Sequence, residues 1–158
     1  MSKDIKKMIR SLLYREKSSS DKYVDYLRRK GANIGSGVFF FSPEKTNIDS
    51  VRIDWITIGD FTKISSGFLM LAHDYSSSVL ISKYNKCLLP GGMETVIGSN
   101  CFIGMNVSVM PGVKIGDNVI LGTGSIVTND IPSNSIAAGV PARVISTLDN
   151  YYEKRINN

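Results

Sequence analysis

The chain has 158 residues, 42% hydrophobic and 21% charged, with a formal net charge of +5, a composition typical of one soluble globular domain. It contains no apolar run of the ~18 to 20 residues that a membrane-spanning helix needs, and its first residues lack the long apolar region of a secretory leader. Cys87 and Cys101 form neither a CxxC pair nor a disulfide framework, so we expect reduced thiols and a cytoplasmic location.

The positive charge is concentrated in residues 1–30, which carry ten Lys or Arg and four Asp or Glu, a net charge of +6. The other 128 residues have a net charge of −1 and no zinc-finger or RNA-binding signature, so we expect no nucleic-acid partner. Helical spacing of apolar residues predicts a basic amphipathic helix, through Ile5, Met8, Ile9, Leu12 and Leu13. A second helix is expected from Asp21 to Lys30, with Ser20 as its N-cap. The segment 1–30 either covers the end of the main body or makes a weak contact with an anionic membrane surface.

Six-residue repeats begin at Ile97 and read IGSNCF, IGMNVS, VMPGVK, IGDNVI, LGTGSI and VTNDIP. The first position is aliphatic, the second is mostly glycine, and the fifth is mostly small or β-branched. The same frame occurs earlier in IGSGVF at Ile34, IGDFTK at Ile58 and ISSGFL at Ile64. It slips between Phe40 and Thr57, where we expect an irregular coil or an insertion.

A period of six matches neither the 3.6 of a helix nor the 2 of a hairpin sheet, and it is typical of a left-handed parallel β-helix. The predicted fold class is therefore mainly β, a hexapeptide-repeat prism in which three hexads make one coil and the first residue of each points inward. The glycine beside it relieves crowding where the backbone turns. We expect a helical cap at 1–30, the β-helix at 31–147 and a helical tail at 148–158, with a helix from Leu148 to Arg155 as a second end cover.

The chain has one histidine, His73, and it lies where the hexad frame stops. Residues 74–95 are polar and irregular, which predicts a loop that protrudes from the prism and returns through Pro90-Gly91-Gly92. A long loop in a compact repeat protein is usually functional. His73 at its base is therefore the strongest candidate for a catalytic residue.

The stretch from Ile97 to Ile145, IGSNCFIGMNVSVMPGVKIGDNVILGTGSIVTNDIPSNSIAAGVPARVI, resembles the hexapeptide-repeat acyltransferases. It is most similar to their maltose, galactoside and nodulation acetyltransferase branch and to the acetyltransferases of polysaccharide clusters. ITIGDFTKISSGFLMLAHDYS, from Ile56 to Ser76, resembles the segment that leads through the catalytic histidine of that family. The resemblance implies a homotrimer that holds acetyl-CoA in the groove between two prisms, with the loop reaching toward a neighbouring subunit.

The resemblance also implies roles for single residues. His73 would act as the general base, since an imidazole titrates near neutral pH, and the Met105 N–H would stabilise the oxyanion and contact the cofactor. The other implied cofactor contacts are Thr123 and Thr128 near the pantetheine arm and Arg143 near the nucleotide phosphates. A further arginine of the family is Ser146 here, so a residue of the tail such as Lys154 is a candidate for its role.

The acceptor site is less defined. Candidates are Asp74, Tyr75 and Tyr84 of the loop, with Asn47 as a candidate for the acceptor-binding asparagine of the galactoside branch. Asp74 has a functional and a structural interpretation. In the first it orients the His73 ring or holds an acceptor hydroxyl; in the second it is a turn residue bonded to its own backbone.

Three functions remain open. The first is an acetyl-CoA-dependent O-acetyltransferase that acts on a sugar or polysaccharide precursor. The second is an N-acetyltransferase of an amino sugar, including a nucleotide-linked one, and the third is a non-catalytic β-helix assembly protein. A zinc-dependent prism of the carbonic anhydrase kind is excluded because it needs three histidines, and no metal is expected.

Overall fold

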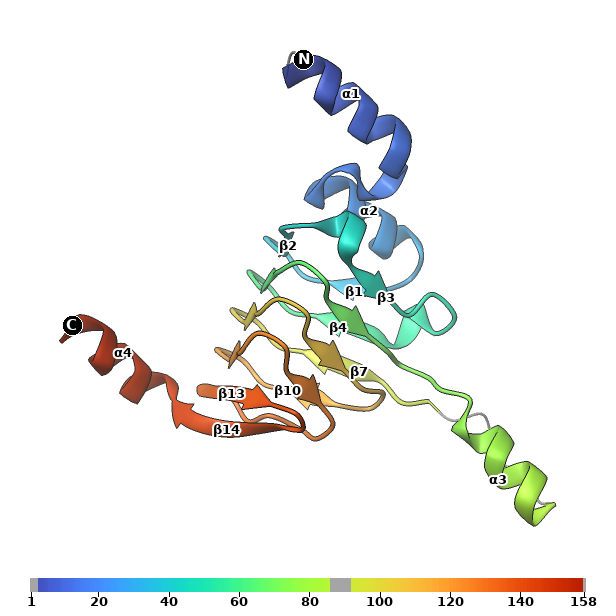
Figure 1. Cartoon of the computed structure of the whole chain (residues 1–158), viewed down its shortest axis with the longest axis vertical. Helices are drawn as coiled ribbons and strands as arrows, with labels where there is room; N and C mark the ends of the chain where they lie inside the picture. Colours follow the sequence, from blue (N-terminus) through green and yellow to red (C-terminus); the bar gives the residue numbers. More distant parts are fainter. Residues whose placement is uncertain (1–2, 86–91, 158) are drawn as a thin grey trace.

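The computed structural model describes residues 3–85 and 92–157, and its body is a three-sided parallel β-helix (Figure 1). Sheet A contains β1 (Asn33–Ile34), β4 (Ile56–Ile58), β7 (Thr95–Ile97) and β10 (Lys114–Ile115). Sheet B contains β2 (Phe39–Phe40), β5 (Lys63–Ile64), β8 (Phe102–Ile103), β11 (Ile120–Leu121), β13 (Ser135–Gly139) and β14 (Ala142–Thr147). Sheet C contains β3 (Asn47–Ile48), β6 (Leu69–Met70), β9 (Ser108–Val109) and β12 (Ile126–Val127). The hexapeptide-repeat prism predicted from the sequence is confirmed.

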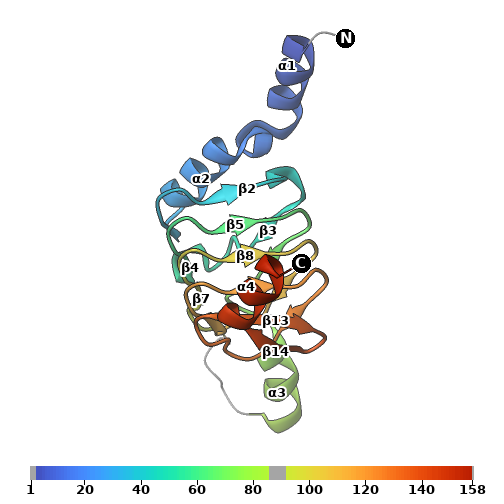
Figure 2. The ribbon, with the colours of Figure 1, turned by 90° about the vertical axis from the view of Figure 1, so that its left-hand side faces the viewer.

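The first positions of the hexads stack inside the prism and form its core. Ile64 of β5 pairs with Ile103 of β8, which pairs with Leu121 of β11, and all three are fully buried. The same coil-to-coil register continues around the other two sheets. Figure 2 shows the strands stacked from one coil to the next. Burying one such aliphatic side chain contributes about 1.5–3 kcal/mol.

The corner glycines relieve crowding, as the sequence suggested, and the structure shows that the crowding is between one coil and the next. Gly98 does not have a positive φ, but a Cβ there would lie 2.6 Å from the backbone of Gly116 in the next coil. The left-handed conformation falls instead at the fourth hexad position, as at Asn100 and Asn118 with φ of 54° and 55°. Their side chains bond to each other, since Asn100 Nδ2 donates to Asn118 Oδ1 over 2.8 Å. Second-position glycine is therefore set by the close approach of stacked coils.

The slipped frame between Phe40 and Thr57 corresponds to an irregular first coil, as expected. Two short 3-10 helices, η2 (Pro43–Lys45) and η3 (Ile53–Trp55), accommodate the extra residues. Between them β3 still pairs with β6, so the coil keeps all three sides.

At the N-terminal end, α2 (Ser20–Arg29) covers the prism with the buried side chains of Tyr23, Val24 and Leu27. The N-cap is Ser19, not Ser20, because Ser20 Oγ instead accepts the Phe40 N–H of β2 over 3.0 Å. Ahead of it lie α1 (Lys3–Tyr14) and η1 (Arg15–Ser18), and α1 extends away from the prism (Figure 1).

At the other end, the expectation that the C-terminal helix covers the prism is wrong. Here β13 turns back into the antiparallel β14, and their residues Ile136, Ala137 and Ala142 are buried. The helix α4 (Leu148–Ile156) has no buried residue and projects beyond the hairpin. The hairpin occupies the apolar end that the helix was expected to cover.

The segment after His73 leaves the prism as expected, and it contains the helix α3 (Ser76–Tyr84), which the sequence reading had not foreseen. Pro90 and Gly91 of the predicted return turn lie outside the described residues, as does Cys87.

Cys101 is a buried free cysteine, and burial raises the pKa of its thiol. No helix in the described parts of the chain has the length and apolar character to cross a membrane.

Candidate functional site

His73 follows β6 at the corner between sheets C and A, at the base of the protruding segment. It forms an antiparallel bridge with Gly92 of the returning strand. Next to it, the Met93 N–H donates to the Ala72 carbonyl over 3.0 Å. Both ends of the protruding segment are therefore held together at the histidine.

Gly92 permits this close packing. A Cβ at Gly92 would lie 2.5 Å from the Trp55 ring and 2.9 Å from the Ala72 carbonyl oxygen. Only a residue without a side chain allows the returning strand to lie between Trp55 and His73. Trp55, from the irregular first coil, thereby becomes a neighbour of the histidine.

The His73 ring is held by Asp49, which follows β3 in that same coil. His73 Nδ1 lies 2.5 Å from Asp49 Oδ2, and the Asp49 side chain is only 1% exposed. Oδ2 also accepts the N–H groups of Ala72 and His73, over 2.9 and 3.0 Å. Oδ1 accepts those of Val51 and Arg52, over 3.0 and 3.1 Å.

These contacts keep the Asp49 carboxyl ionised. Burial opposes its charge, but hydrogen bonds from the backbone of Ala72, Arg52 and Val51 and from His73 outweigh burial and lower its pKa to about 2. A carboxylate cannot donate, so His73 Nδ1 carries the proton in this contact, and in the neutral form of the ring Nε2 then has the free lone pair. The ring is 19% exposed, so a substrate can reach it.

Sequence reasoning missed Asp49 and offered Asp74 for the role of orienting the ring. The Asp74 carboxylate instead accepts from the Ser76 N–H and hydroxyl, over 2.9 and 2.6 Å, which is its reading as a turn residue. Asp49 lies where the hexad frame slips, so its register could not be read. Its one signal is a carboxylate directly after the inward-facing Ile48, where most hexads have glycine.

Two pockets flank His73. The first, which we call the His73 pocket, has a volume of about 230 Å³ and is lined by Val51, Arg52, Trp55, Asp74, Tyr75 and Ser77 beside the histidine. The second has about 200 Å³ and includes Asn47, Asp49, Leu69 and Leu71. The acceptor candidates Asp74, Tyr75 and Asn47 thus lie beside the histidine, and the Tyr75 ring meets it edge-on at 5.5 Å between centroids. Tyr84, at the end of α3, lines neither pocket.

The predicted cofactor residues separate into two corners. Met105 and Thr123 lie at the corner that precedes sheet C, in neighbouring coils joined by a bond of 2.8 Å from the Gly124 N–H to the Met105 carbonyl. Thr128 follows β12 at the corner after sheet C, on the side of His73, and its hydroxyl donates to Asn129. The strands of sheet C are parallel, and Met105 precedes one of them whereas His73 follows another. One chain therefore places the two residues at opposite edges of sheet C, one where its strands begin and one where they end.

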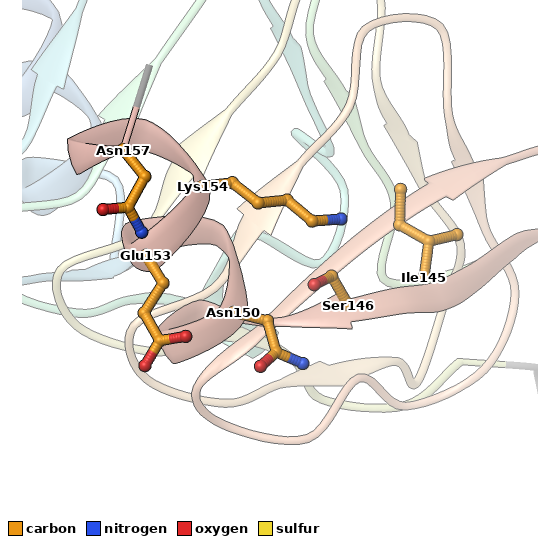
Figure 3. Close-up of a pocket in the computed structure, with 6 residues that line it drawn as sticks. All are labelled: Ile145, Ser146, Asn150, Glu153, Lys154 and Asn157. Carbon is orange, nitrogen blue, oxygen red and sulfur yellow. The ribbon is translucent and has the colours of Figure 1, made fainter.

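Ser146 and Lys154, both named from the sequence, line one pocket between β14 and α4. A pocket of about 510 Å³ is lined by Ile145, Ser146, Asn150, Glu153, Lys154 and Asn157. Figure 3 shows the Lys154 side chain extending from α4 toward Ser146 and Ile145 of β14. Arg143 lies earlier on β14, where its guanidinium donates to the Ala142 carbonyl over 2.9 Å.

Within residues 3–85 and 92–157, no group of three or more His, Cys, Asp or Glu side chains is placed to hold a metal ion.

Comparisons with known proteins agree with this architecture. The bacterial transferase hexapeptide family (six repeats) matches residues 94–129. CapG of Staphylococcus aureus is 34% identical over 154 residues, which cover 98% of this chain and 85% of CapG. The putative lipopolysaccharide biosynthesis O-acetyl transferase WbbJ of Escherichia coli K12 is 37% identical over 126 residues, 74% of this chain but only 64% of WbbJ. A maltose O-acetyltransferase from Clostridium difficile 630 superposes with a TM-score of 0.56 at 26% identity, over 80% of this chain and 75% of that one.

Proposed function

The chain belongs to the bacterial hexapeptide-repeat transferases, and from that premise we propose that it is an acetyl-CoA-dependent O-acetyltransferase acting on a sugar or polysaccharide precursor. The observation that carries the proposal is the His73–Asp49 pair, in which a buried carboxylate fixes the ring beside a pocket of about 230 Å³. The similarity to WbbJ and to a maltose O-acetyltransferase supports a hydroxyl acceptor on a sugar.

The proposed chemistry needs one proton carrier. Acetyl-CoA supplies an acetyl group that is already activated as a thioester. His73 Nε2 accepts the proton of the acceptor hydroxyl while the hydroxyl oxygen bonds to the acyl carbon, and it then gives that proton to the departing sulfur. The Met105 N–H donates to the negative charge that develops on the acyl oxygen. Asp49 holds the ring in the tautomer that this transfer requires.

A second subunit is part of the proposal. His73 and Met105 lie on opposite edges of sheet C, and one hexad of extended backbone spans on the order of 15–20 Å. One chain therefore does not bring both groups to the same carbon atom. We infer a homotrimer in which the His73 corner of one prism faces the Met105 corner of the next.

The nucleotide end of acetyl-CoA would lie toward the C-terminal hairpin. Arg143 is the proposed contact for its phosphates, with Thr123 and Thr128 along the pantetheine arm. Ser146 supplies no positive charge, and Lys154 reaches the same pocket from α4. Lys154 is therefore our candidate for the cation that balances a phosphate there.

Thiol release from acetyl-CoA tests the function. Wild type and His73→Ala are compared with neutral sugars, acidic sugars, amino sugars and nucleotide sugars as acceptors. O-acetylation of a sugar by wild type alone supports the proposal. Transfer only to amines would favour the N-acetyltransferase, and no transfer to any acceptor would favour the assembly protein.

A further inference from the structure

We propose that the His73 pocket selects an acceptor sugar that carries an anionic group, a carboxylate or a phosphate, and that Arg52 binds this group. The inference rests on the proposed function, because it identifies the class of substrate that the same site takes. Its basis is the state of the Arg52 guanidinium, which is fixed in place yet has few hydrogen-bond partners in the protein.

The position of Arg52 is coupled to the catalytic pair. Its backbone N–H donates to Asp49 Oδ1 over 3.1 Å, and Asp49 is the residue that holds His73. Its guanidinium carbon lies 3.6 Å from the centre of the Trp55 ring. Stacking over an indole fixes the plane of a guanidinium and leaves its N–H groups able to form hydrogen bonds within that plane.

The hydrogen-bonding capacity of this guanidinium is largely unused. Arg52 Nε is buried and has no hydrogen-bond partner among the described residues. Among the described residues its one ion pair joins a terminal nitrogen to Asp54 Oδ2 at 3.8 Å, beyond hydrogen-bond length, and both side chains are substantially exposed. An exposed pair of this length contributes little, so the terminal N–H groups can be taken over by a ligand.

The surroundings favour an anion on a sugar. Arg52 is the one Lys or Arg among the described residues that line the His73 pocket. The Asp74 carboxylate there accepts two bonds from Ser76 at Oδ1, and because this side chain is exposed, water screens its charge. The exposed Tyr75 supplies aromatic surface for a sugar ring, and a volume of about 230 Å³ favours one sugar residue over a larger ligand.

A guanidinium matches the geometry of both carboxylate and phosphate, so the chemistry of Arg52 defines an anionic oxygen group and not which of the two it is. A charge-assisted hydrogen bond contributes about 1.5–3 kcal/mol, which corresponds to roughly 10- to 150-fold in kcat/KM. Wild type should therefore prefer a charged sugar over its neutral counterpart by about this factor.

The test uses matched acceptors: a hexuronic acid and the neutral hexose, and a hexose phosphate and the methyl hexoside. The ratio of kcat/KM within each pair is measured for wild type, Arg52→Gln, Arg52→Lys and the control Asp54→Asn. We expect the ratio to fall toward one in Arg52→Gln, to be intermediate in Arg52→Lys, and to be kept or raised in Asp54→Asn. The pair with the larger ratio identifies carboxylate or phosphate as the recognised group.

A second measurement separates this inference from the proposed function. Binding of the hexuronic acid and the hexose phosphate is measured by calorimetry without acetyl-CoA, alongside the melting temperature of each variant. Binding to wild type but not to folded Arg52→Gln supports the anion site even if no acetyl transfer occurs. Equal ratios in wild type and Arg52→Gln, or a wild type without preference in either pair, would overturn it. If Arg52→Gln does not fold, the kcat/KM ratio of Arg52→Lys decides: a ratio below that of wild type supports the inference, and a ratio equal to that of wild type overturns it.

Discussion

Asp49 and His73 are 24 residues apart in the chain, and a hydrogen bond joins them beside the pocket. Four backbone N–H groups hold the carboxylate, so its position is set by the turns after β3 and β6 together. At the scale of single residues, the proposed chemistry therefore relies on an anion that the protein itself fixes beside His73.

The first prediction concerns the base. His73→Ala should lower kcat by about 10²- to 10⁴-fold, because general base catalysis is lost. The affinity for acetyl-CoA should change little, since the ring acts on the proton of the acceptor. Steady-state kinetics with both substrates measure the two effects, and the melting temperature serves as the control for folding. A folded variant as active as wild type would contradict the role of His73.

The second prediction concerns the anion that holds the base. The pKa of Asp49 is about 2 in the folded protein, below its ordinary value of 3.8, so its ionisation stabilises the fold above pH 4. That contribution, on the order of 2 kcal/mol, should be lost as the pH falls from about 5 to 2. Asp49→Asn should lack this part of the pH dependence and should also lower kcat. Urea unfolding of both proteins between pH 2 and 7 measures the difference, and parallel curves would refute it.

At the scale of elements, the close approach of neighbouring coils limits the size of the side chain at the second position of a hexad. Gly98→Ala would place a methyl group 2.5 Å from Asp117 Oδ1 and 2.6 Å from the Gly116 backbone. We expect a loss of about 3 kcal/mol in the free energy of unfolding, because the stacked backbone cannot move aside. Gly124→Ala is the control, since its Cβ would meet nothing within 4 Å and only its φ of 74° is unfavourable, at about 1 kcal/mol. Urea denaturation should rank the two in this order, and the reverse order would argue against steric stacking.

The helix α1 exposes Met8, Leu12 and Leu13 by 66%, 79% and 68%, within a segment 1–30 of net charge +6. Apolar side chains combined with positive charge suit an anionic lipid surface. We predict that the full chain binds vesicles containing phosphatidylglycerol but not those of phosphatidylcholine alone, and that Leu12→Ser with Leu13→Ser weakens this binding. Val79→Ser on α3, also exposed, is the matched control and should bind as wild type does. Co-sedimentation measures binding: no binding to either vesicle type would exclude the lipid contact, and equal binding to both would contradict its dependence on anionic lipid.

At the scale of the whole molecule, the fifth prediction is that the active species is a trimer. Light scattering should give about three times the 17.4 kDa of one chain. Dilution or mild denaturant that dissociates the trimer should abolish turnover before the prism unfolds, because His73 and Met105 lie on opposite edges of sheet C. Parallel measurement of mass, circular dichroism and thiol release distinguishes the two events. A stable monomer that turns over would rule out the shared site.

The hexads were sufficient to predict the prism, because a six-residue period places one aliphatic side chain inward per side of every coil. Ile97, Ile103 and Val109 are all fully buried, as that reading requires. The lone histidine at the end of the regular frame likewise marked the base of the protruding segment. These features are local, so the order of residues along the chain specifies them.

Only the tertiary structure decided what surrounds that histidine. Asp49, Arg52 and Trp55 come from the irregular first coil, where the hexad frame slips and no periodicity gives the register. They reach His73 because β3 pairs with β6 and because Gly92 leaves room for Trp55. The fold class follows from a sequence pattern that recurs in every hexad. The site depends on single contacts between coils, which exist only once the coils are stacked.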